Sequence, residues 1–186
     1  ACKDYKNIDL GISFRHVYEV TIGDTEKDAD GILTTTCVSY PLSMSCNHCD
    51  SPICFEKCPQ SAIIKDADTG LMSIDEEKCI GCGTCAIVCP YSAPKVDEEK
   101  KKAVRCDLCA DRVTQGKQPI CVEACPLRAL DFGEISELRK KYGEVAAVAP
   151  LPSADETKPN IVITEPVNAK PAGDTTGSVL NEREIA

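Results

Sequence analysis

The stretch that decides the fold is the run Cys79-Ile80-Gly81-Cys82-Gly83-Thr84-Cys85-Ala86-Ile87-Val88-Cys89-Pro90. Its spacing, C-x2-C-x2-C-x3-C-P, places three thiolates on one tight loop, from which they can reach three irons of one [4Fe–4S] cubane. Gly81 and Gly83 allow the backbone angles that bring this loop close to the inorganic sulfides. The fourth cysteine lies on the first turn of a helix and binds a different cluster. The run therefore predicts clusters that exchange their fourth ligands.

Twelve of the 14 cysteines form three such quartets, and each quartet ends in Cys-Pro. The two outer quartets repeat the bacterial-ferredoxin spacing with one gap lengthened, as C-x2-C-x4-C-x3-C-P and C-x2-C-x11-C-x3-C-P. Because the C-x2-C pair and the x3 step are retained, we interpret the quartets as an internal repeat of one unit. The cofactor-binding residues predicted from the quartets are Cys46, Cys49, Cys54, Cys58, Cys79, Cys82, Cys85, Cys89, Cys106, Cys109, Cys121 and Cys125.

Two other uses of cysteine fit less of this pattern. A disulfide framework has no reason to repeat C-x2-C and Cys-Pro at fixed offsets three times. Structural zinc takes four tetrahedral ligands from two cysteine pairs, which the last quartet alone imitates and the run from Cys79 does not. The favoured prediction is therefore a set of [4Fe–4S] clusters.

Cys2 and Cys37 lie outside the quartets. Cys37, in the strand-like run 32–40, is predicted to be a small buried hydrophobic residue. Clusters that exchange ligands come in pairs, so three quartets leave one without a mate. We expect Cys2 to be the last cysteine of a fourth quartet, whose x3 spacing would place the preceding cysteine upstream of Ala1. On this expectation the sequence begins inside its first motif.

Composition excludes several classes of function. The 186 residues include only five tyrosines, three phenylalanines and no tryptophan, so something besides hydrophobic burial must hold the fold together. With 21 basic and 30 acidic side chains, the net charge of −9 argues against nucleic acid or an anionic membrane surface as the main partner. No segment approaches the roughly 20 apolar residues of a spanning helix, so we expect no direct membrane span.

The sequence predicts no catalytic residue in this chain. Neither His16 nor His48 has a partner arranged for nucleophilic chemistry, and no phosphate-binding or dinucleotide-binding motif occurs. We interpret His48, between two cysteines of the first quartet, as packed beside a cluster; a hydrogen bond to the cluster is the alternative. One-electron transfer is the chemistry that remains.

Between the quartets the pattern predicts short hairpins and helices. Hairpins are expected from His16–Ile22 to Ile32–Tyr40, and within 62–74 and 94–105; helices are expected to begin near Cys54, Cys85 and Cys121. A strand at 129–132 and a helix at 135–142, ended by Gly143, are expected after the last quartet. The predicted fold class is α+β, with tandem bacterial-ferredoxin-like modules, β-hairpin insertions and an extended C-terminal tail.

Longer phrases around the cysteines resemble a known family. The phrases Cys46-Asn47-His48-Cys49, Cys79-Ile80-Gly81-Cys82, Arg105-Cys106-Asp107-Leu108-Cys109 and 119–130 are similar to the four-cluster ferredoxin-type subunits of molybdopterin oxidoreductases. Segments 145–152, 158–163 and 173–177 narrow the resemblance to the iron–sulfur (B) subunits of anaerobic dimethyl sulfoxide reductases, rather than their nitrate reductase or formate dehydrogenase relatives. The resemblance runs from Cys2 to the C-terminus.

The resemblance implies a non-catalytic electron-transfer subunit. Such a subunit lies between a polytopic, quinol-oxidising membrane anchor and a molybdopterin catalytic subunit that reduces dimethyl sulfoxide or a similar S- or N-oxide. It is peripheral to the cytoplasmic membrane as part of the complex, on a face that the sequence does not determine. The alternatives are an electron-transfer subunit of another molybdopterin oxidoreductase and a free polyferredoxin.

The resemblance also assigns ligands to individual clusters, which we call the first, second and third cysteine sets. The first set is Cys46, Cys49, Cys54 and Cys89; the second is Cys58, Cys79, Cys82 and Cys85; the third is Cys2, Cys106, Cys109 and Cys121. Cys125 would belong to an incomplete fourth, so three [4Fe–4S] clusters are expected to be complete in this chain and four in the presumed full-length protein. A cysteine at position 82 argues for four irons rather than three in the second cluster.

We expect four segments along the chain. Residues 1–45 hold the remainder of a first ferredoxin module with a hairpin, 46–105 the second module with two quartets, and 106–150 the return to the first module and the C-terminal helix. Residues 151–186 contain no cysteine and no aromatic residue, so they cannot fold on their own hydrophobic surface. We expect this tail to wrap a partner subunit; a disordered linker is the alternative.

Overall fold

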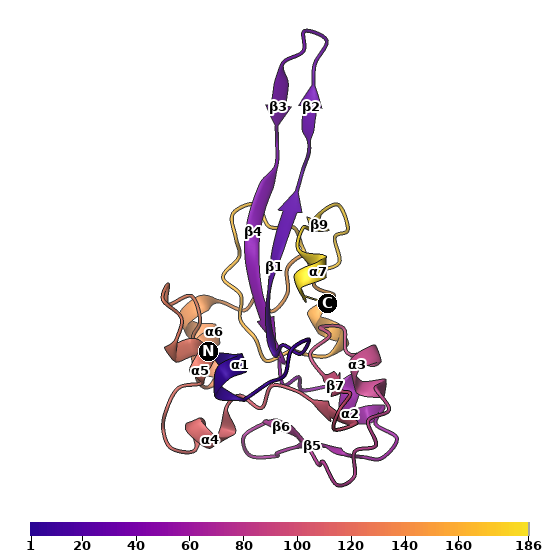
Figure 1. The fold of residues 1–186 in the computed structure, drawn as a ribbon. Coiled ribbons are helices and arrows are strands. Elements are labelled where there is room, and N and C mark those ends of the chain that lie inside the picture. Colours follow the sequence, from indigo (N-terminus) through magenta and orange to yellow (C-terminus); the bar gives the residue numbers. More distant parts are fainter. Residues whose placement is uncertain (186) are drawn as a thin grey trace.

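The longest regular structure is an antiparallel ribbon of β1 (Arg15–Ile22) and β4 (Val38–Ser45). The computed structural model, which describes residues 1–185, has this ribbon rising from a body of short helices and hairpins (Figure 1). Side chains along the ribbon alternate between buried and more exposed positions, as expected when one face packs on a core. β9 (Ser178–Val179) pairs with the other edge of β1, so the strand order is β4-β1-β9.

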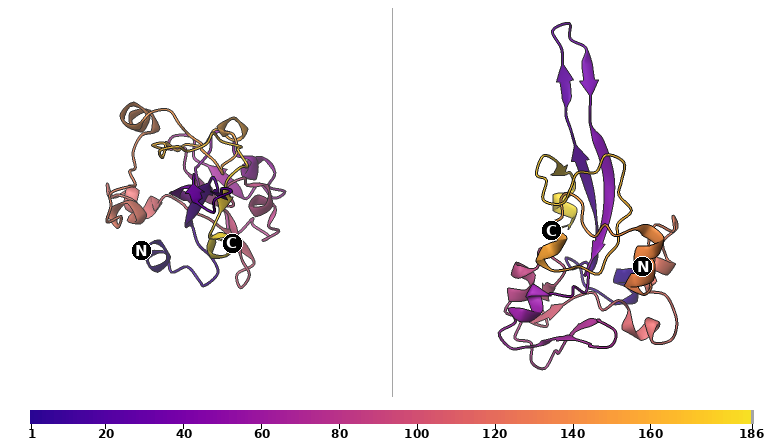
Figure 2. Two further views of the ribbon diagram at one scale, coloured as in Figure 1. Left: turned by 90° about the horizontal axis from the view of Figure 1, so that it is seen from above. Right: turned by 180° about the vertical axis from the view of Figure 1, so that it is seen from behind.

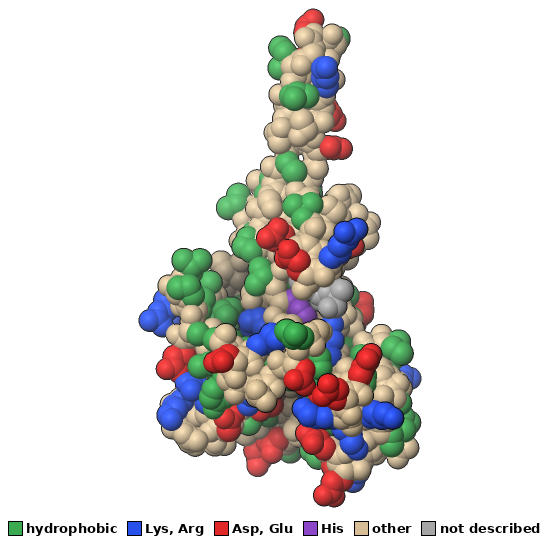
Figure 3. Space-filling view, viewed as in Figure 1, with side chains coloured by type: hydrophobic (Ala, Val, Ile, Leu, Met, Phe, Trp, Pro, Cys, Tyr) green, Lys and Arg blue, Asp and Glu red, His purple; other side chains and the backbone are tan. Residues whose placement is uncertain are grey.

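The outer part of the ribbon is exposed on all sides. β2 (Thr25–Lys27) and β3 (Leu33–Thr35) continue it away from the body, and every residue of both strands is exposed (Figures 1 and 3). The predicted hairpin is therefore present, but its second half is divided into two strands and extends to Ser45. Cys37 lies in the gap between β3 and β4 and is exposed. The prediction that Cys37 is buried was wrong, because no other element covers the ribbon at this height.

The body consists of short helices and hairpins around the cysteine loops. The helices are α1 (Cys2–Tyr5), α2 (Ile53–Glu56), α3 (Thr84–Val88), α4 (Ala110–Val113), α5 (Ile120–Glu123) and α6 (Ile135–Tyr142). The hairpins are β5 (Ile63–Lys65) with β6 (Met72–Ile74), and β7 (Lys95–Asp97) with β8 (Lys102–Val104). The predicted helices near Cys54, Cys85 and Cys121 and the two short hairpins are confirmed. The chain is thus a mixed α+β protein with small antiparallel sheets.

The region after the last quartet differs in part from the prediction. The helix ends at Gly143 as expected, and this glycine adopts a φ of 99°. Residues 129–132 do not form a strand, however. The Arg128 N–H instead donates to the Cys125 carbonyl at 3.2 Å, so the chain turns back on the end of α5 here and has no strand to pair with among the residues that the structure describes.

Residues 148–179 cover the ribbon of their own chain. Val148, Leu151 and Ile163 are buried in one core with residues of β1 and β4, and the hydroxyl of Tyr40 donates a hydrogen bond to the Ala149 carbonyl at 2.7 Å. Figure 2 shows this segment, in orange to yellow, looping around the base of the ribbon. It continues through the 3-10 turn η1 (Ala154–Glu156) and β9 to α7 (Glu182–Ile185). The tail therefore completes the core that β1 and β4 begin; its contact with a partner subunit stays a prediction.

The helices described within residues 1–185 include none long and apolar enough to cross a membrane.

We predict that Ile163→Ala, in the cluster-loaded protein, lowers the free energy of unfolding by about 2–4 kcal/mol, because it opens a cavity in the core under the tail. Val167→Ala is the matched control in the same tail, since Val167 is 82% exposed. Thermal unfolding followed by far-ultraviolet circular dichroism at one scan rate measures both. Equal changes in the two variants would contradict the packing described for the tail.

Candidate iron–sulfur centres

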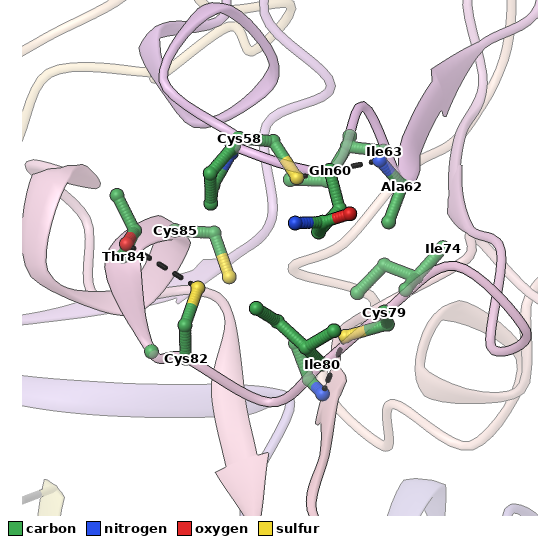
Figure 4. A pocket seen from close by; sticks show the side chains of 13 residues that line it. Cys58, Gln60, Ala62, Ile63, Ile74, Cys79, Ile80, Cys82, Thr84 and Cys85 are labelled. Atoms are coloured by element: carbon green, nitrogen blue, oxygen red, sulfur yellow. Dashed lines mark hydrogen bonds between the residues drawn. The ribbon is translucent and has the colours of Figure 1, made fainter.

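The thiols of the second cysteine set line a single pocket. Figure 4 shows the sulfur atoms of Cys58, Cys79, Cys82 and Cys85 facing a common space. Three of these thiols come from the loop before and at the start of α3, and Cys58 follows α2. Ile63, Ile74 and Ala103 supply apolar walls. The structure thus brings together the four cysteines predicted for this cluster.

Hydrogen-bond donors surround the sulfurs of the second set. The backbone N–H of Ala62 donates to Cys58 Sγ at 3.3 Å, and that of Ala103 donates to Cys79 Sγ at the same distance. The Thr84 hydroxyl lies 3.3 Å from Cys82 Sγ, and this contact lowers the pKa of Cys82. Hydrogen bonds to sulfur stabilise thiolates and tune the potential of a bound cluster.

Gly81 allows the cysteine loop to pass close to the β7–β8 turn. Its φ is +67°, and a Cβ added to it would lie 2.2 Å from the carbonyl oxygen of Lys101. Lys102 holds the same approach from the other side, because its Nζ donates to the Cys79 carbonyl at 2.6 Å. Any side chain at position 81 would therefore push the loop off the hairpin.

The first cysteine set gathers at the base of β4, where the chain leaves the ribbon. Burial raises the pKa of Cys49 to about 11, and the nearby thiolates of Cys46, Cys89 and Cys54 add to this rise. The backbone N–H of His48 donates to Cys46 Sγ at 3.4 Å. Cys46 and Cys54 are buried, and Cys49 and Cys89 are half-buried. Four such thiols repel one another when ionised and need positive charge between them, which the irons of a cluster supply.

The third set joins the N-terminus to the loop before α4. Cys2, Cys106, Cys109 and Cys121 line one pocket. Lys6 holds the N-terminal helix there, because its Nζ forms ion pairs with Asp107 at 2.9 Å and Asp111 at 2.8 Å. Burial raises the pKa of Cys106 to about 12.

Packing places the first set between the other two. Cys54 belongs to one buried cluster with Cys79 and Cys85 of the second set. Arg105, which contacts Cys46 and Cys54, directly precedes Cys106 of the third set. Cys54 of the first set is close enough to raise the pKa of Cys85 in the second. Cys46 of the first set likewise raises the pKa of Cys106 in the third. The spatial order is therefore second, first, third, although the chain runs through the sets in a different order.

Cys125 occupies a separate position at the end of α5. Backbone hydrogen bonds, with that of Ala129 the strongest, lower the pKa of its thiol. Such a cluster of N–H groups is typical of sites for anions and metal-bound thiolates. Its assignment to a fourth cluster stays a prediction.

The donor sets fit a cluster better than a single ion. Four sulfurs around one zinc each lie about 2.3 Å from it and therefore close to one another. Within residues 1–185, no three His, Cys, Asp or Glu side chains lie close enough to hold one metal ion. The thiols line open pockets with apolar walls and N–H donors, and this arrangement suits a cubane of several irons.

Two residues near the sulfurs have roles that the sequence left open or missed. His48 is 4% exposed, its Nδ1 accepts the N–H of Met72 at 2.9 Å, and burial lowers its pKa to about 3. This agrees with its interpretation as a packed residue. Arg105 was not predicted to act on a cluster, but it is buried and its guanidinium contacts Cys46 and Cys54. Arg105 directly precedes the pair Cys106 and Cys109, and this position could have indicated a role beside a cluster. The sequence does not show which sulfurs its guanidinium contacts.

Short C-x2-C loops, cysteines gathered around common pockets and interleaved hairpins define a ferredoxin-type iron–sulfur protein. Residues 37–135 match the family model described as a 4Fe-4S dicluster domain. Over all of its length the sequence is 53% identical to the B subunit of anaerobic dimethyl sulfoxide reductase from Escherichia coli strain K12, of which it covers 89%. It is 48% identical to the B subunit of the Haemophilus influenzae reductase, with 100% of this chain and 90% of that protein covered. A more distant relative is the nitrate-inducible formate dehydrogenase iron–sulfur subunit of Escherichia coli, 39% identical over 50% of this chain and 32% of that protein.

The protein therefore belongs to the family of anaerobic dimethyl sulfoxide reductase B subunits. As a member of this family it is an iron–sulfur electron-transfer subunit of an oxidoreductase complex, and it carries 4Fe-4S clusters.

We predict that Gly81→Ala removes about four irons per chain, the content of one [4Fe–4S] cluster. The added Cβ collides with the Lys101 carbonyl and displaces the loop that carries three thiols of the second set. Gly70→Ala is the control, because Gly70 has a φ of +69° but no atom within 4 Å of an added Cβ. Iron and acid-labile sulfide per chain are measured after anaerobic reconstitution. A full iron content in Gly81→Ala would show that this close approach is not needed.

Proposed function

We propose that this chain passes electrons, one at a time, through three [4Fe–4S] clusters held by the first, second and third cysteine sets. The electrons come from a polytopic membrane anchor that oxidises quinol. They go to a molybdopterin catalytic subunit that reduces dimethyl sulfoxide or a similar S- or N-oxide. The observation that carries the proposal is that three complete sets of four cysteines meet in space in a continuous series.

A bound [4Fe–4S] cluster supplies a one-electron couple. The residues of this chain hold that couple in place and set its surroundings. Backbone N–H groups donate to sulfur, and apolar walls limit the access of water. Because the first set lies next to both others, its cluster is the middle one of the three that pass the electron.

The crossed positions of two cysteines support the ligand assignment. Cys58 belongs to the first quartet in sequence, yet its sulfur faces the pocket of the Cys79 loop. Cys89 belongs to the second quartet, yet its thiolate raises the pKa of Cys49 in the first set. Exchange of fourth ligands between paired clusters is the behaviour of bacterial ferredoxins.

The same contacts support the proposed segments. Residues 46–105 contain the whole of the first and second sets, and act as one ferredoxin-like module. Residues 1–45 and 106–150 meet through the third set and the ion pairs of Lys6, and act as the other module. The proposed tail segment is 151–186; its described part packs against the ribbon, and its outer surface is the part available to a partner subunit. As part of such a complex, the protein lies peripheral to the cytoplasmic membrane.

Likeness along the whole chain favours the dimethyl sulfoxide reductase role over the alternatives. The match to the formate dehydrogenase subunit spans only half of this chain, whereas the match to the reductase B subunits includes the tail.

We predict that Cys58→Ser and Cys89→Ser change different clusters from those of their own quartets. Cys58→Ser should alter the electron paramagnetic resonance signal that Cys79→Ser also alters, and Cys89→Ser the signal that Cys46→Ser alters. Cys37→Ser is the control, because this exposed cysteine belongs to no set, and it should retain about 12 irons per chain, four for each of three clusters. Pairing of Cys58 with Cys46 would overturn the crossed assignment.

We also predict that Cys46→Ser, in the assembled complex, abolishes quinol-dependent reduction of dimethyl sulfoxide. Reduction driven by a dye that feeds the catalytic subunit directly should persist, since only the relay is broken. Both rates are measured on the same membranes, with the Cys37→Ser complex as the control. Quinol-dependent turnover at the control rate in Cys46→Ser would contradict the proposed relay.

A further inference from the structure

Arg105 places a positive charge against the middle cysteine set. It follows β8 directly, and only 7% of its surface is exposed. Its Nη2 donates to Cys46 Sγ, and its Nη1 lies 3.8 Å from Cys54 Sγ. The planar guanidinium thus contacts two sulfurs of one set.

This cation has no carboxylate partner. Among residues 1–185, none of the ion pairs joins Arg105 to an aspartate or a glutamate. Its Nε is buried and has no hydrogen-bond partner. Burying a guanidinium without a negative partner is costly, so its position implies that negative charge resides on the sulfurs it contacts.

We propose that Arg105 sets the reduction potential of the cluster in the first cysteine set. The inference rests on the ligand assignment proposed above. An electron added to a thiolate-ligated cluster adds a negative charge, and a fixed cation in contact with two of its sulfurs stabilises that charge. The guanidinium does not lose its proton in proteins, so the stabilisation is permanent.

The effect of Arg105 on the reduction potential matters for electron transfer because of where the first set lies. The first set lies between the second and third sets. It has two buried and two half-buried cysteines, whereas Cys82 of the second set is exposed and only Cys109 of the third set is buried. An enclosed cluster resists the added charge of reduction, since burial disfavours charge. Arg105 offsets this cost at the first-set cluster. A low reduction potential there would make electron transfer into this cluster unfavourable from either neighbouring cluster.

The test is a redox titration of the complete, reconstituted chain, followed by electron paramagnetic resonance after iron has been counted. In Arg105→Gln, the ratio of reduced to oxidised first-set cluster should fall about tenfold at a given ambient potential, which equals about 59 mV for a one-electron couple. Arg105→Lys keeps the charge but contacts two sulfurs less well, so its fall should be smaller. Arg183→Gln removes the same charge from exposed helix α7 and should leave the potential unchanged.

The outcomes separate this inference from the function on which it rests. A full iron content with an unchanged potential in Arg105→Gln would overturn the role of Arg105. If Arg105→Gln does not retain the cluster, Arg105→Lys decides: a lowered potential supports the role, and a potential equal to or above that of the unaltered protein overturns it. Cys46→Ser and Cys54→Ser identify the signal of the first set. If they alter different signals, the ligand assignment fails instead.

Discussion

The burial of sulfur is the constraint on which the rest of this structure depends. Burial raises the pKa of Cys49 and Cys85 to about 11 and that of Cys106 to about 12. These thiols hold their protons near neutral pH unless something supplies positive charge between them. Metal clusters bind thiolates, so cluster binding and the ordering of the polypeptide become one free-energy change. The body of the protein is arranged around this requirement.

The shortness of the elements follows from that arrangement. The helices of the body range from four to eight residues, too short to be stable in water without tertiary contacts. Two hydrophobic cores assist them. One, under the ribbon, takes Val148 and Ile163 from beyond the last quartet, whereas the other contains Cys54, Cys79 and Cys85 themselves. The first cysteine set lies where these cores meet, because Cys49 packs against one and Cys54 belongs to the other.

The sequence predicted the parts of this protein that repeat and missed the parts that depend on distant contacts. Cysteine spacing is local, so it indicated the quartets and the helices beside Cys54, Cys85 and Cys121. The strand expected at 129–132 is absent because the chain turns at Arg128, whose N–H donates to the Cys125 carbonyl, and no neighbouring strand pairs with it within residues 1–185. The ion pair between Lys6 and Asp107 joins residues 101 positions apart, which no local pattern encodes. The segment after Val148 lacked aromatic residues, yet a few aliphatic side chains were enough to fill a core already half built by the ribbon.

A difference in exposure distinguishes the three sets and fits their order in space. The second set has two buried cysteines but also the exposed Cys82. The first set has two buried cysteines and none exposed, and in the third set only Cys109 is buried. A relay needs its end stations near the surface, where electrons enter and leave, and its middle station shielded from water. Shielding alone would make the middle station hard to reduce, because an added charge is poorly stabilised away from solvent. The buried guanidinium of Arg105 offsets this penalty without admitting water, because its positive charge lies against two sulfurs of the first set. The burial of this set and the charge of Arg105 therefore compensate each other in their effects on the proposed cluster's potential.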